Sequence, residues 1–241
     1  MNRICYVRVY GDLRYLLHKK YRDGEITIKF LLSASVKDII ESLGIPHTEV
    51  GLVLLNGISA DWNEKISDGS RLAVYPFFYN VDIKTISRVY WQPERIRFVS
   101  DVHLGRLSKY LRILGFDCVY QNNFEDEEII EIAHREKRII LTKDRGILKN
   151  NRVKYGLLLR SKNTKEQLKE VMERFDLEAK KKPFTRCINC NQKLKKISRK
   201  EAMGVFSYLS DRYYTDFYRC SLCKKVYYKG SHYYRMLKEI F

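Results

Sequence analysis

The stretch IRFVSDVHLGRLSKYLRILG, residues 96–115, decides the fold of the middle of this chain. Its first six residues are mostly β-forming and end in a carboxylate, Asp101, which is typical of a short strand that leads into a turn. The following residues have a helical repeat, which places four leucines on one narrow arc: Leu104, Leu107, Leu111 and Leu114. Gly115 then ends the repeat. The stretch therefore predicts a buried strand followed by an amphipathic helix.

Strand and helix patterns alternate along the residues that follow. Strand patterns cover residues 116–120, 138–142 and 155–160, a helix pattern begins near Glu125, and another covers residues 164–175. Short strands that alternate with helices predict a small parallel sheet with helices on both faces. We therefore expect an α/β/α domain over residues 95–180.

Three aspartates occupy matched places in this predicted domain. Asp101 and Asp144 lie just past predicted strands, and Asp126 lies in the first turn of the helix that leads to the second of those strands. Parallel sheets bind ligands beyond the carboxyl ends of their strands, and neighbouring carboxylates repel one another unless a cation neutralises them. Such oxygen ligands favour Mg²⁺ or Mn²⁺, which activate water for phosphodiester hydrolysis. A nuclease site is one interpretation. The other is that each aspartate only caps a helix or a turn.

Four of the six cysteines form two Cys-x-x-Cys turns, Cys187–Cys190 and Cys220–Cys223. Two such turns supply the four thiolates that structural Zn²⁺ prefers. Two disulfides are the alternative, but the chain begins without an apolar signal segment, which favours a reducing, cytoplasmic location. We expect a zinc ribbon over residues 181–241, with Cys5 and Cys118 as small core residues.

Positive charge is concentrated in the same region. Residues 181–241 contain 15 of the 46 Lys and Arg residues and 4 of the 29 Asp and Glu residues, which gives this region a net charge of +11. Ten aromatic residues are interleaved with these charges: Phe206, Tyr208, Tyr213, Tyr214, Phe217, Tyr218, Tyr227, Tyr228, Tyr233 and Tyr234. Basic groups neutralise phosphates and exposed rings stack on bases, so the composition predicts nucleic-acid binding. The alternative is that many of these rings only form the core of a small ribbon.

The first 80 residues form a separate pattern. Strand signals at residues 4–10 and 26–32 precede a short helix that Ser35 caps and Gly44 ends, and two further strand signals follow at residues 50–55 and 71–75. This ββαββ order predicts a β-grasp fold. The segments GDLR at 11–14 and LLNG at 54–57 resemble ubiquitin-like sulfur carriers of the ThiS and MoaD kind. Those carriers end in a free Gly-Gly, whereas this chain continues, so we expect a packing or binding module, followed by a linker over residues 79–94.

Residues 98–117, most of which belong to the quoted stretch, resemble the Mut-7 C-terminal RNase domain family, which belongs to the PIN-like nucleases. The resemblance continues through DEEII at 126–130 and LTKDRG at 141–146, and reaches the ribbon through the first cysteine pair and YYKGSH at 227–232. In many members a ubiquitin-like domain precedes the nuclease. The resemblance implies a PIN-like fold in which Asp101, Asp126 and Asp144 hold a metal ion, with Glu128 as a candidate fourth ligand. Residues 155–162 contain no clear candidate for the late acidic residue of PIN nucleases.

Cations near the predicted acidic site are candidates for binding RNA phosphates: Arg106, Lys109, Arg112, Lys143 and Arg145. For the first three, which share the polar side of one helix, a solvated helix face is the alternative.

The motifs, the charge and the resemblance together leave two candidate functions for the protein. The first is an Mg²⁺- or Mn²⁺-dependent, endonucleolytic ribonuclease whose zinc ribbon binds RNA. The second is a non-catalytic RNA-binding adaptor whose β-grasp domain recruits a protein partner. No apolar run approaches the roughly 18 residues that cross a bilayer, so no membrane role is expected.

Overall fold

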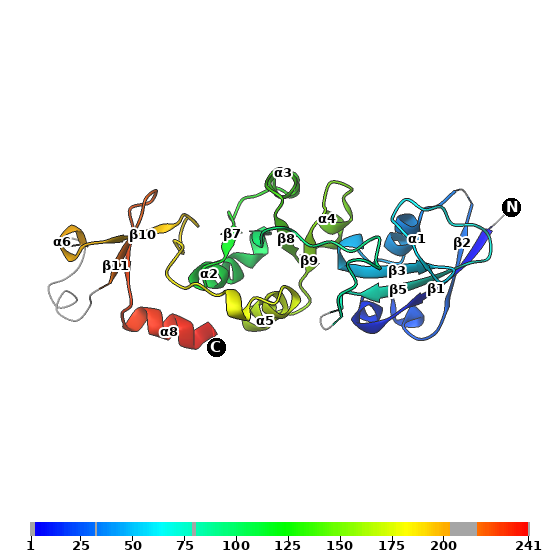
Figure 1. Ribbon diagram of the computed structural model, residues 1–241, viewed down its shortest axis with the longest axis horizontal. Helices are drawn as coiled ribbons and strands as arrows, with labels where there is room; N and C mark the ends of the chain where they lie inside the picture. The colour runs from blue at the N-terminus through cyan, green and yellow to red at the C-terminus, as the bar shows by residue number, and fades with distance from the viewer. Residues whose placement is uncertain (1–2, 32, 79–80, 203–215, 241) are drawn as a thin grey trace. The chain divides into compact units, whose positions relative to one another are not determined.

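The structure, a computed structural model, describes residues 3–31, 33–78, 81–202 and 216–240 (Figure 1). The chain divides into two compact units, residues 1–94 with 130–158 and residues 95–129 with 159–241. Both mix helices and strands, as predicted. The predicted domain ranges 1–80, 95–180 and 181–241 stay predictions. None of the helices in the described residues has the length and apolar character needed to cross a membrane.

The first unit contains a five-stranded sheet in the order β2-β1-β5-β3-β4. Its strands are β1 (Arg3–Val9), β2 (Ile26–Phe30), β3 (Val50–Leu55), β4 (Ile58–Ser59) and β5 (Ser70–Pro76). β1 and β5 run parallel, and the other neighbouring strands are antiparallel. Helix α1 (Val36–Ser42) lies beside the sheet (Figure 1), and its residues Val36, Ile39 and Ile40 are buried. This arrangement confirms the predicted β-grasp fold.

Local sequence signals explain where these elements begin and end. Ser35 and Asp38 form a reciprocal capping box at the start of α1, and Gly44 adopts a φ of +91° just past its end. Asn56 and Gly57, with φ values of +51° and +88°, form the tight turn from β3 to β4. Three short 3-10 helices complete this part of the unit: η1 (Gly11–Leu16), η2 (Lys19–Tyr21) and η3 (His47–Glu49).

The same unit includes a second, parallel strand pair. The pair consists of β8 (Ile139–Thr142) and β9 (Gly156–Leu158), and the short helix α4 (Arg145–Lys149) lies between them in the sequence. Buried polar contacts join this pair to the β-grasp part. The Leu158 amide donates to Glu49 Oε1 over 2.7 Å, and the ring nitrogens of His47 lie 2.7 Å from Glu41 Oε1 and 2.8 Å from the Val153 carbonyl oxygen. The β-grasp part is therefore packed on residues 130–158 rather than only tethered to them.

The second unit begins with the stretch that opened the sequence analysis. Strand β6 (Arg97–Ser100) pairs in parallel with β7 (Asp117–Val119), and the turn η4 (Val102–Leu104) leads into α2 (Gly105–Ile113). The four leucines of the predicted arc are all buried. Helix α5 (Thr164–Arg174) follows the predicted range closely, and α3 (Asp126–Glu136) crosses the division between the units. The predicted strand-to-helix order and the parallel pairing are confirmed.

A three-stranded antiparallel sheet in the order β10-β11-β12 forms the ribbon. The strands are β10 (Leu194–Ile197), β11 (Phe217–Cys220) and β12 (Val226–Tyr228), and the short helix α6 (Arg199–Ala202) follows β10. A short turn η5 (Glu178–Lys180) precedes the ribbon, and α8 (Ser231–Ile240), which the sequence patterns did not predict, follows it (Figure 1).

Candidate functional site

The four ribbon cysteines lie on two matching turns. The residue that follows the second cysteine of each pair has a positive φ, +67° at Asn191 and +60° at Lys224. Each turn is also closed by a hydrogen bond from the amide of its first cysteine, from Cys187 to the Gln192 carbonyl and from Cys220 to the Lys225 carbonyl. The two turns therefore have the same local geometry, and their thiols meet at one site.

The sulfur positions fit one tetrahedral metal ion. All four Sγ atoms lie within 4.8 Å of one another, with 3.5 Å between Cys187 and Cys223 and 3.3 Å between Cys190 and Cys220. Zn–S bonds of about 2.3 Å in a tetrahedron place sulfurs roughly 3.8 Å apart, whereas a disulfide needs about 2.05 Å. This donor set can hold a metal ion such as zinc, and the geometry is not that of two disulfides.

Tyr227 acts on this cluster from outside the ligand set. Its hydroxyl lies 3.0 Å from Cys187 Sγ, to which it can donate a hydrogen bond. Burial raises the pKa of Cys187, but the Tyr227 hydrogen bond and those within the cysteine cluster outweigh it and lower the pKa to about 7. Burial, together with hydrogen bonds that the Cys190 thiol donates to neighbouring sulfur atoms, raises the pKa of Cys190 to about 12. One thiolate forms readily and suppresses ionisation of its neighbour, and a divalent cation is what allows all of them to ionise.

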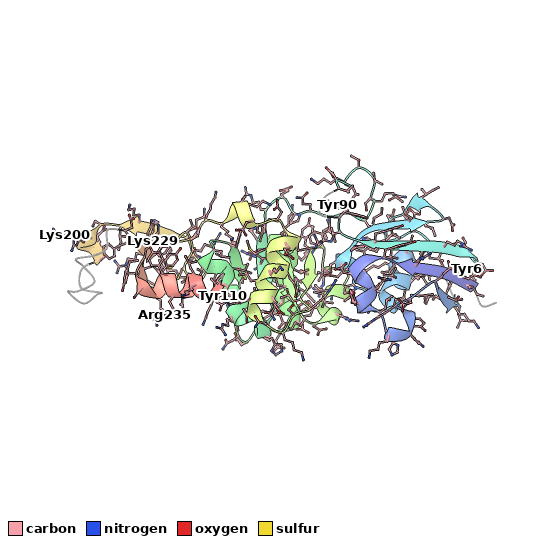
Figure 2. The ribbon with its side chains drawn as sticks, turned by 90° about the horizontal axis from the view of Figure 1, so that it is seen from below. Tyr6, Tyr90, Tyr110, Lys200, Lys229 and Arg235 are labelled. Carbon is pink, nitrogen blue, oxygen red and sulfur yellow. The ribbon has the colours of Figure 1, made fainter. Side chains whose placement is uncertain are left out.

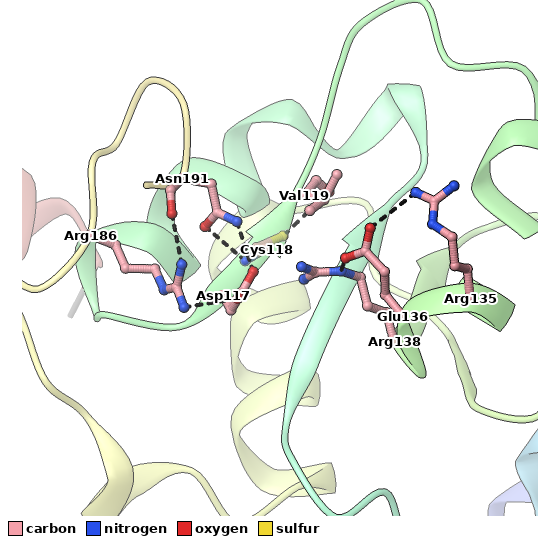
Figure 3. A network of polar contacts seen from close by, with 8 residues as sticks. All are labelled: Asp117, Cys118, Val119, Arg135, Glu136, Arg138, Arg186 and Asn191. Atoms are coloured by element: carbon pink, nitrogen blue, oxygen red, sulfur yellow. Dashed lines mark hydrogen bonds and ion pairs between the residues drawn. The ribbon is translucent and has the colours of Figure 1, made fainter. Parts of the chain in front are cut away.

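The first cysteine turn is bound to the strand-and-helix part of its unit (Figure 3). Asn191 donates to Asp117 Oδ1 over 2.8 Å and accepts from the Cys118 amide over 3.0 Å. Arg186 donates to Asp117 Oδ2 over 2.8 Å and to the Asn191 carbonyl over 2.8 Å. β7 and the cysteine turn thus share a closed polar network, which joins this cysteine loop to the strand-and-helix part of the unit.

Arg112 belongs to the same contact. The sequence placed it with Arg106 and Lys109 on a basic helix face, yet it is only 4% exposed. Its guanidinium donates to the carbonyl oxygens of Cys118, Ile188 and Asn189 at 2.8, 3.0 and 2.8 Å. Burial lowers the pKa of Arg112, and the nearby thiols and Asp117 oppose that shift. The Arg112 guanidinium is therefore bound to the loop between the first two cysteines, instead of lying on the solvated face that the sequence predicted.

The other two cations of that helix are exposed. Arg106 Nε donates to the Tyr110 hydroxyl over 3.1 Å, and its guanidinium carbon lies 5.7 Å from the centre of that ring. Lys109 is on the surface three residues further along. These two side chains keep the solvent access that phosphate binding requires.

The predicted acidic ligands lie at the ends of strands and at the start of a helix. Asp101 directly follows β6, is 6% exposed and accepts a hydrogen bond from the His103 amide over 3.2 Å. Asp144 follows β8 and caps α4, with its Oδ1 2.6 Å from the Gly146 nitrogen. Both aspartates thus have the capping role that the sequence left as an alternative. One carboxylate can cap a helix and bind a metal, so these caps are compatible with both roles.

Asp126 and Glu128 are exposed in the first turn of α3, and Glu128 Oε2 accepts from the Glu125 amide over 2.9 Å. Asp101 and Asp126 belong to the second unit and Asp144 to the first. In the described part of the chain, the four cysteines form the one group of three or more potential ligands within 4.8 Å of one another. Metal binding by the aspartates therefore stays a prediction.

Lys143 and Arg145 flank Asp144 but differ in their surroundings. Lys143 is exposed. The Arg145 guanidinium donates to the Leu16 carbonyl over 2.9 Å and lies 3.4 Å from the Gly44 carbonyl, both in the β-grasp part. Arg145 thereby acts as a bridge inside the first unit.

The ribbon surface is basic and partly aromatic. Lys200, Lys229 and Arg235 are exposed (Figure 2). Among the aromatic residues that the sequence singled out, Phe217 and Tyr233 are buried, Tyr234 is 60% exposed, and Phe206, Tyr208, Tyr213 and Tyr214 lie outside the described residues. A cavity of about 310 Å³ is lined mainly by aromatic and aliphatic side chains, including Phe184, Tyr227 and Tyr228. The described rings thus divide between core and surface.

Sequence reasoning missed three functional features of this region. Tyr227 beside the thiols, Asn191 and Arg186 in the polar network, and the whole of α8 were not assigned. Asn191 directly follows a cysteine pair, so the need for a positive φ there was a usable signal. The partners of Tyr227 and Arg186 are distant in sequence, and no spacing pattern points to them.

Two family models match the chain. One, described as Mut7-C RNAse domain, matches residues 96–240, which is more than half of the chain. The other, described as Mut7-C ubiquitin, matches residues 2–82. No curated protein matched. The two matches follow the order that the motifs predicted, a ubiquitin-like segment before an RNase segment.

Proposed function

Because the chain belongs to the Mut7-C RNAse domain family, we propose that it is a metal-dependent ribonuclease that cuts phosphodiester bonds within RNA chains. The family match over residues 96–240 is the observation that carries this proposal. The positions of Asp101 and Asp144 just past parallel strands support it, because such positions are where α/β sheets bind their ligands.

The roles of the residues follow from their chemistry. Asp101, Asp126 and Asp144 are the proposed ligands of Mg²⁺ or Mn²⁺, and Glu128 is the candidate fourth carboxylate. When bound, such an ion polarises the phosphate and lowers the pKa of a bound water. Arg106, Lys109 and Lys143 are exposed cations that can neutralise flanking phosphates. Arg112 and Arg145 contribute through the contacts that hold the ribbon loop and the β-grasp part.

We assign the four cysteines to structural Zn²⁺ and the surrounding ribbon to RNA binding. The support for zinc is the set of four thiols within 4.8 Å on two matching turns. The support for RNA is the net charge of +11 over residues 181–241, together with exposed rings such as Tyr234.

The test is cleavage of total cellular RNA by the purified protein with Mg²⁺ or Mn²⁺, beside Asp101→Asn and Asp144→Asn variants. Asparagine caps a helix as well as aspartate does, so these variants keep the cap and remove only the charge. We expect both to lose cleavage by at least about a hundredfold. Asp23→Asn, at an exposed position in a loop, is the matched control and should cut normally.

A non-catalytic RNA-binding adaptor is the second candidate, with the β-grasp part recruiting a protein partner. The observation that favours it is that Asp101 and Asp144 both serve as caps, which gives each carboxylate a structural role without a metal. In that case the wild type and both variants bind RNA equally and none of them cuts it with any divalent cation.

A further inference from the structure

The first unit contains a cleft of about 660 Å³ that neither family match nor the proposed active site explains. Its walls come from three segments of that unit, residues 35–63, 88–92 and 151–155. The volume is in the range of small-molecule sites, which is about 300–1,000 Å³. Both tryptophans of the chain, Trp62 and Trp91, line it.

Aromatic side chains of the cleft are held in place by specific contacts. Trp91 donates from Nε1 to the Thr48 carbonyl over 3.2 Å and packs on Tyr155 with ring centres 5.2 Å apart. Trp62 meets the edge of the His47 ring at 5.9 Å, and both nitrogens of that ring are within hydrogen-bonding distance of oxygen atoms. Tyr90 adds another ring from the segment before β6 (Figure 2). The cleft is therefore lined by aromatic rings that neighbouring residues hold in place.

The charge of the lining is mainly positive. Lys37, Arg88 and Lys154 line the cleft, against one carboxylate, Asp38. That carboxylate accepts hydrogen bonds from the Ser35 backbone and hydroxyl in the helix cap, and these bonds lower the pKa of Asp38. Arg88 is paired with Asp61 and Glu64. Lys37 donates to Asn151 Oδ1 and lies 4.0 Å from Glu41 Oε1. Lys154, in contrast, has no ion-pair or hydrogen-bond partner within the described ranges. An anionic ligand would find an available cation at this edge.

We propose that this cleft binds a nucleotide, with its base stacked on the aromatic side chains and its phosphate on Lys154. Flat π-systems combined with lysines match a base joined to a phosphate, and side-chain amides of Asn63, Gln92 and Asn151 supply donors and acceptors for a base edge. The source is either a free nucleotide or a single-stranded segment of RNA. Binding of a free nucleotide does not depend on the proposed function, because no residue of the cleft belongs to the proposed metal site. Binding of RNA at the cleft rests on the proposed function.

Tryptophan fluorescence tests this proposal directly, because both tryptophans report on the cleft. The full-length Asp101→Asn protein is titrated, without divalent cations, with a nucleoside monophosphate, a short single-stranded oligoribonucleotide, inorganic phosphate and a short acidic peptide. We expect saturable quenching by the monophosphate, by the oligonucleotide or by both. The first result alone identifies a free nucleotide, and the second alone identifies RNA. Absence of saturation with both, or equal binding of the acidic peptide or of phosphate alone, overturns the proposal.

Two variants locate the binding. Lys154→Glu should weaken it at least about fivefold, whereas Lys29→Glu, the same charge change at an exposed position of β2, should not. Trp62→Leu keeps Trp91 as the reporter and should also weaken binding at least about fivefold through lost stacking. Equal affinities for Lys154→Glu and Lys29→Glu contradict the site even if Trp62→Leu fails to fold. Binding by the Asp101→Asn protein is independent of cleavage, so failure of the nuclease proposal leaves this result interpretable.

Discussion

Arg112 illustrates how one side chain can hold a metal-binding loop. Its planar guanidinium reaches the carbonyl oxygens of Ile188 and Asn189, which lie between the first two cysteines, and also the Cys118 carbonyl at β7. Lysine has one ammonium and cannot span these positions with the same geometry. A residue that helical periodicity assigned to a polar face is therefore buried, because backbone acceptors surround it.

We expect Arg112→Met to lower the free energy of unfolding by about 3 kcal/mol, because it removes donors from buried carbonyl groups. The variant should also release its metal faster to a chromogenic chelator. Urea unfolding and the release rate measure the two effects. Lys109→Met, at an exposed position of the same helix, is the control. Loss of RNA affinity in Arg112→Met at unchanged stability would contradict this role.

Tyr227 is the second residue whose role depends on one contact. Its hydroxyl lies 3.0 Å from Cys187 Sγ, and this contact contributes to the lowered pKa of that thiol. Hydrogen bonds to metal ligands orient them and tune their basicity.

Tyr227→Phe keeps the ring and removes only the hydroxyl, so we expect zinc affinity to fall about tenfold. Competition against a chelator of known affinity measures the change. Tyr228→Phe, in the neighbouring position of β12, should bind zinc like the wild type. Equal affinities in the two variants would show that the Tyr227 hydroxyl does not act on the metal site.

At the scale of elements, the turn from β8 into α4 serves two parts of the first unit. Asp144 caps α4, while Arg145 reaches carbonyl oxygens at Leu16 and Gly44 in the β-grasp part. Gly44 follows α1 with a positive φ, so its carbonyl belongs to a helix end that a cation can stabilise. Neighbouring residues of one motif thus have different roles because their side chains leave the turn in different directions.

Arg145→Ala should lower the unfolding free energy by about 1 kcal/mol, while Lys143→Ala should have no measurable effect on stability. Thermal unfolding of the two variants tests this difference. RNA affinity separates the roles further, because a phosphate contact made by Lys143 predicts weaker binding in Lys143→Ala alone. An unchanged melting temperature in Arg145→Ala would argue against the bridge.

At the scale of the whole molecule, we expect the ribbon to depend on the proposed zinc ion more than the other parts do. Its strands are short, with four residues in β10 and β11 and three in β12, and the four thiols lie between its two turns. The β-grasp sheet, in contrast, has an apolar core that includes Val7, Val53 and Val74 at 0% exposed. Small domains with few buried apolar groups rely on a structural metal.

Removal of zinc by a chelator should therefore raise amide hydrogen exchange across β10, β11 and β12 and leave exchange in β1 and β5 unchanged. Exchange followed by mass spectrometry gives both readings in one experiment. Re-addition of Zn²⁺ serves as the control and should restore protection. Unchanged protection of the ribbon in the metal-free protein would mean that zinc contributes little to its folding.

Local patterns were enough to predict much of this architecture. The cap at Ser35, the end of α1 at Gly44 and the single helical arc of the four leucines all follow from patterns among residues that are close in sequence. The two cysteine pairs were also readable, because each pair is a local turn. Helix α8 and the burial of Arg112 could not be predicted from local patterns, because each depends on packing against distant segments.

The sequence alone determined the order of the main strands and helices up to residue 175, the β-grasp and α/β classes, the group of four thiols and the concentration of charge in residues 181–241. Only the tertiary structure decided that Arg112 holds the ribbon loop, that Arg145 joins α4 to the β-grasp part, and that both tryptophans line one cleft. The physical reason is the range of the interactions. Periodicity and capping act over a few residues, whereas a buried cation finds its acceptors, and an aromatic ring its neighbours, only when distant segments pack together.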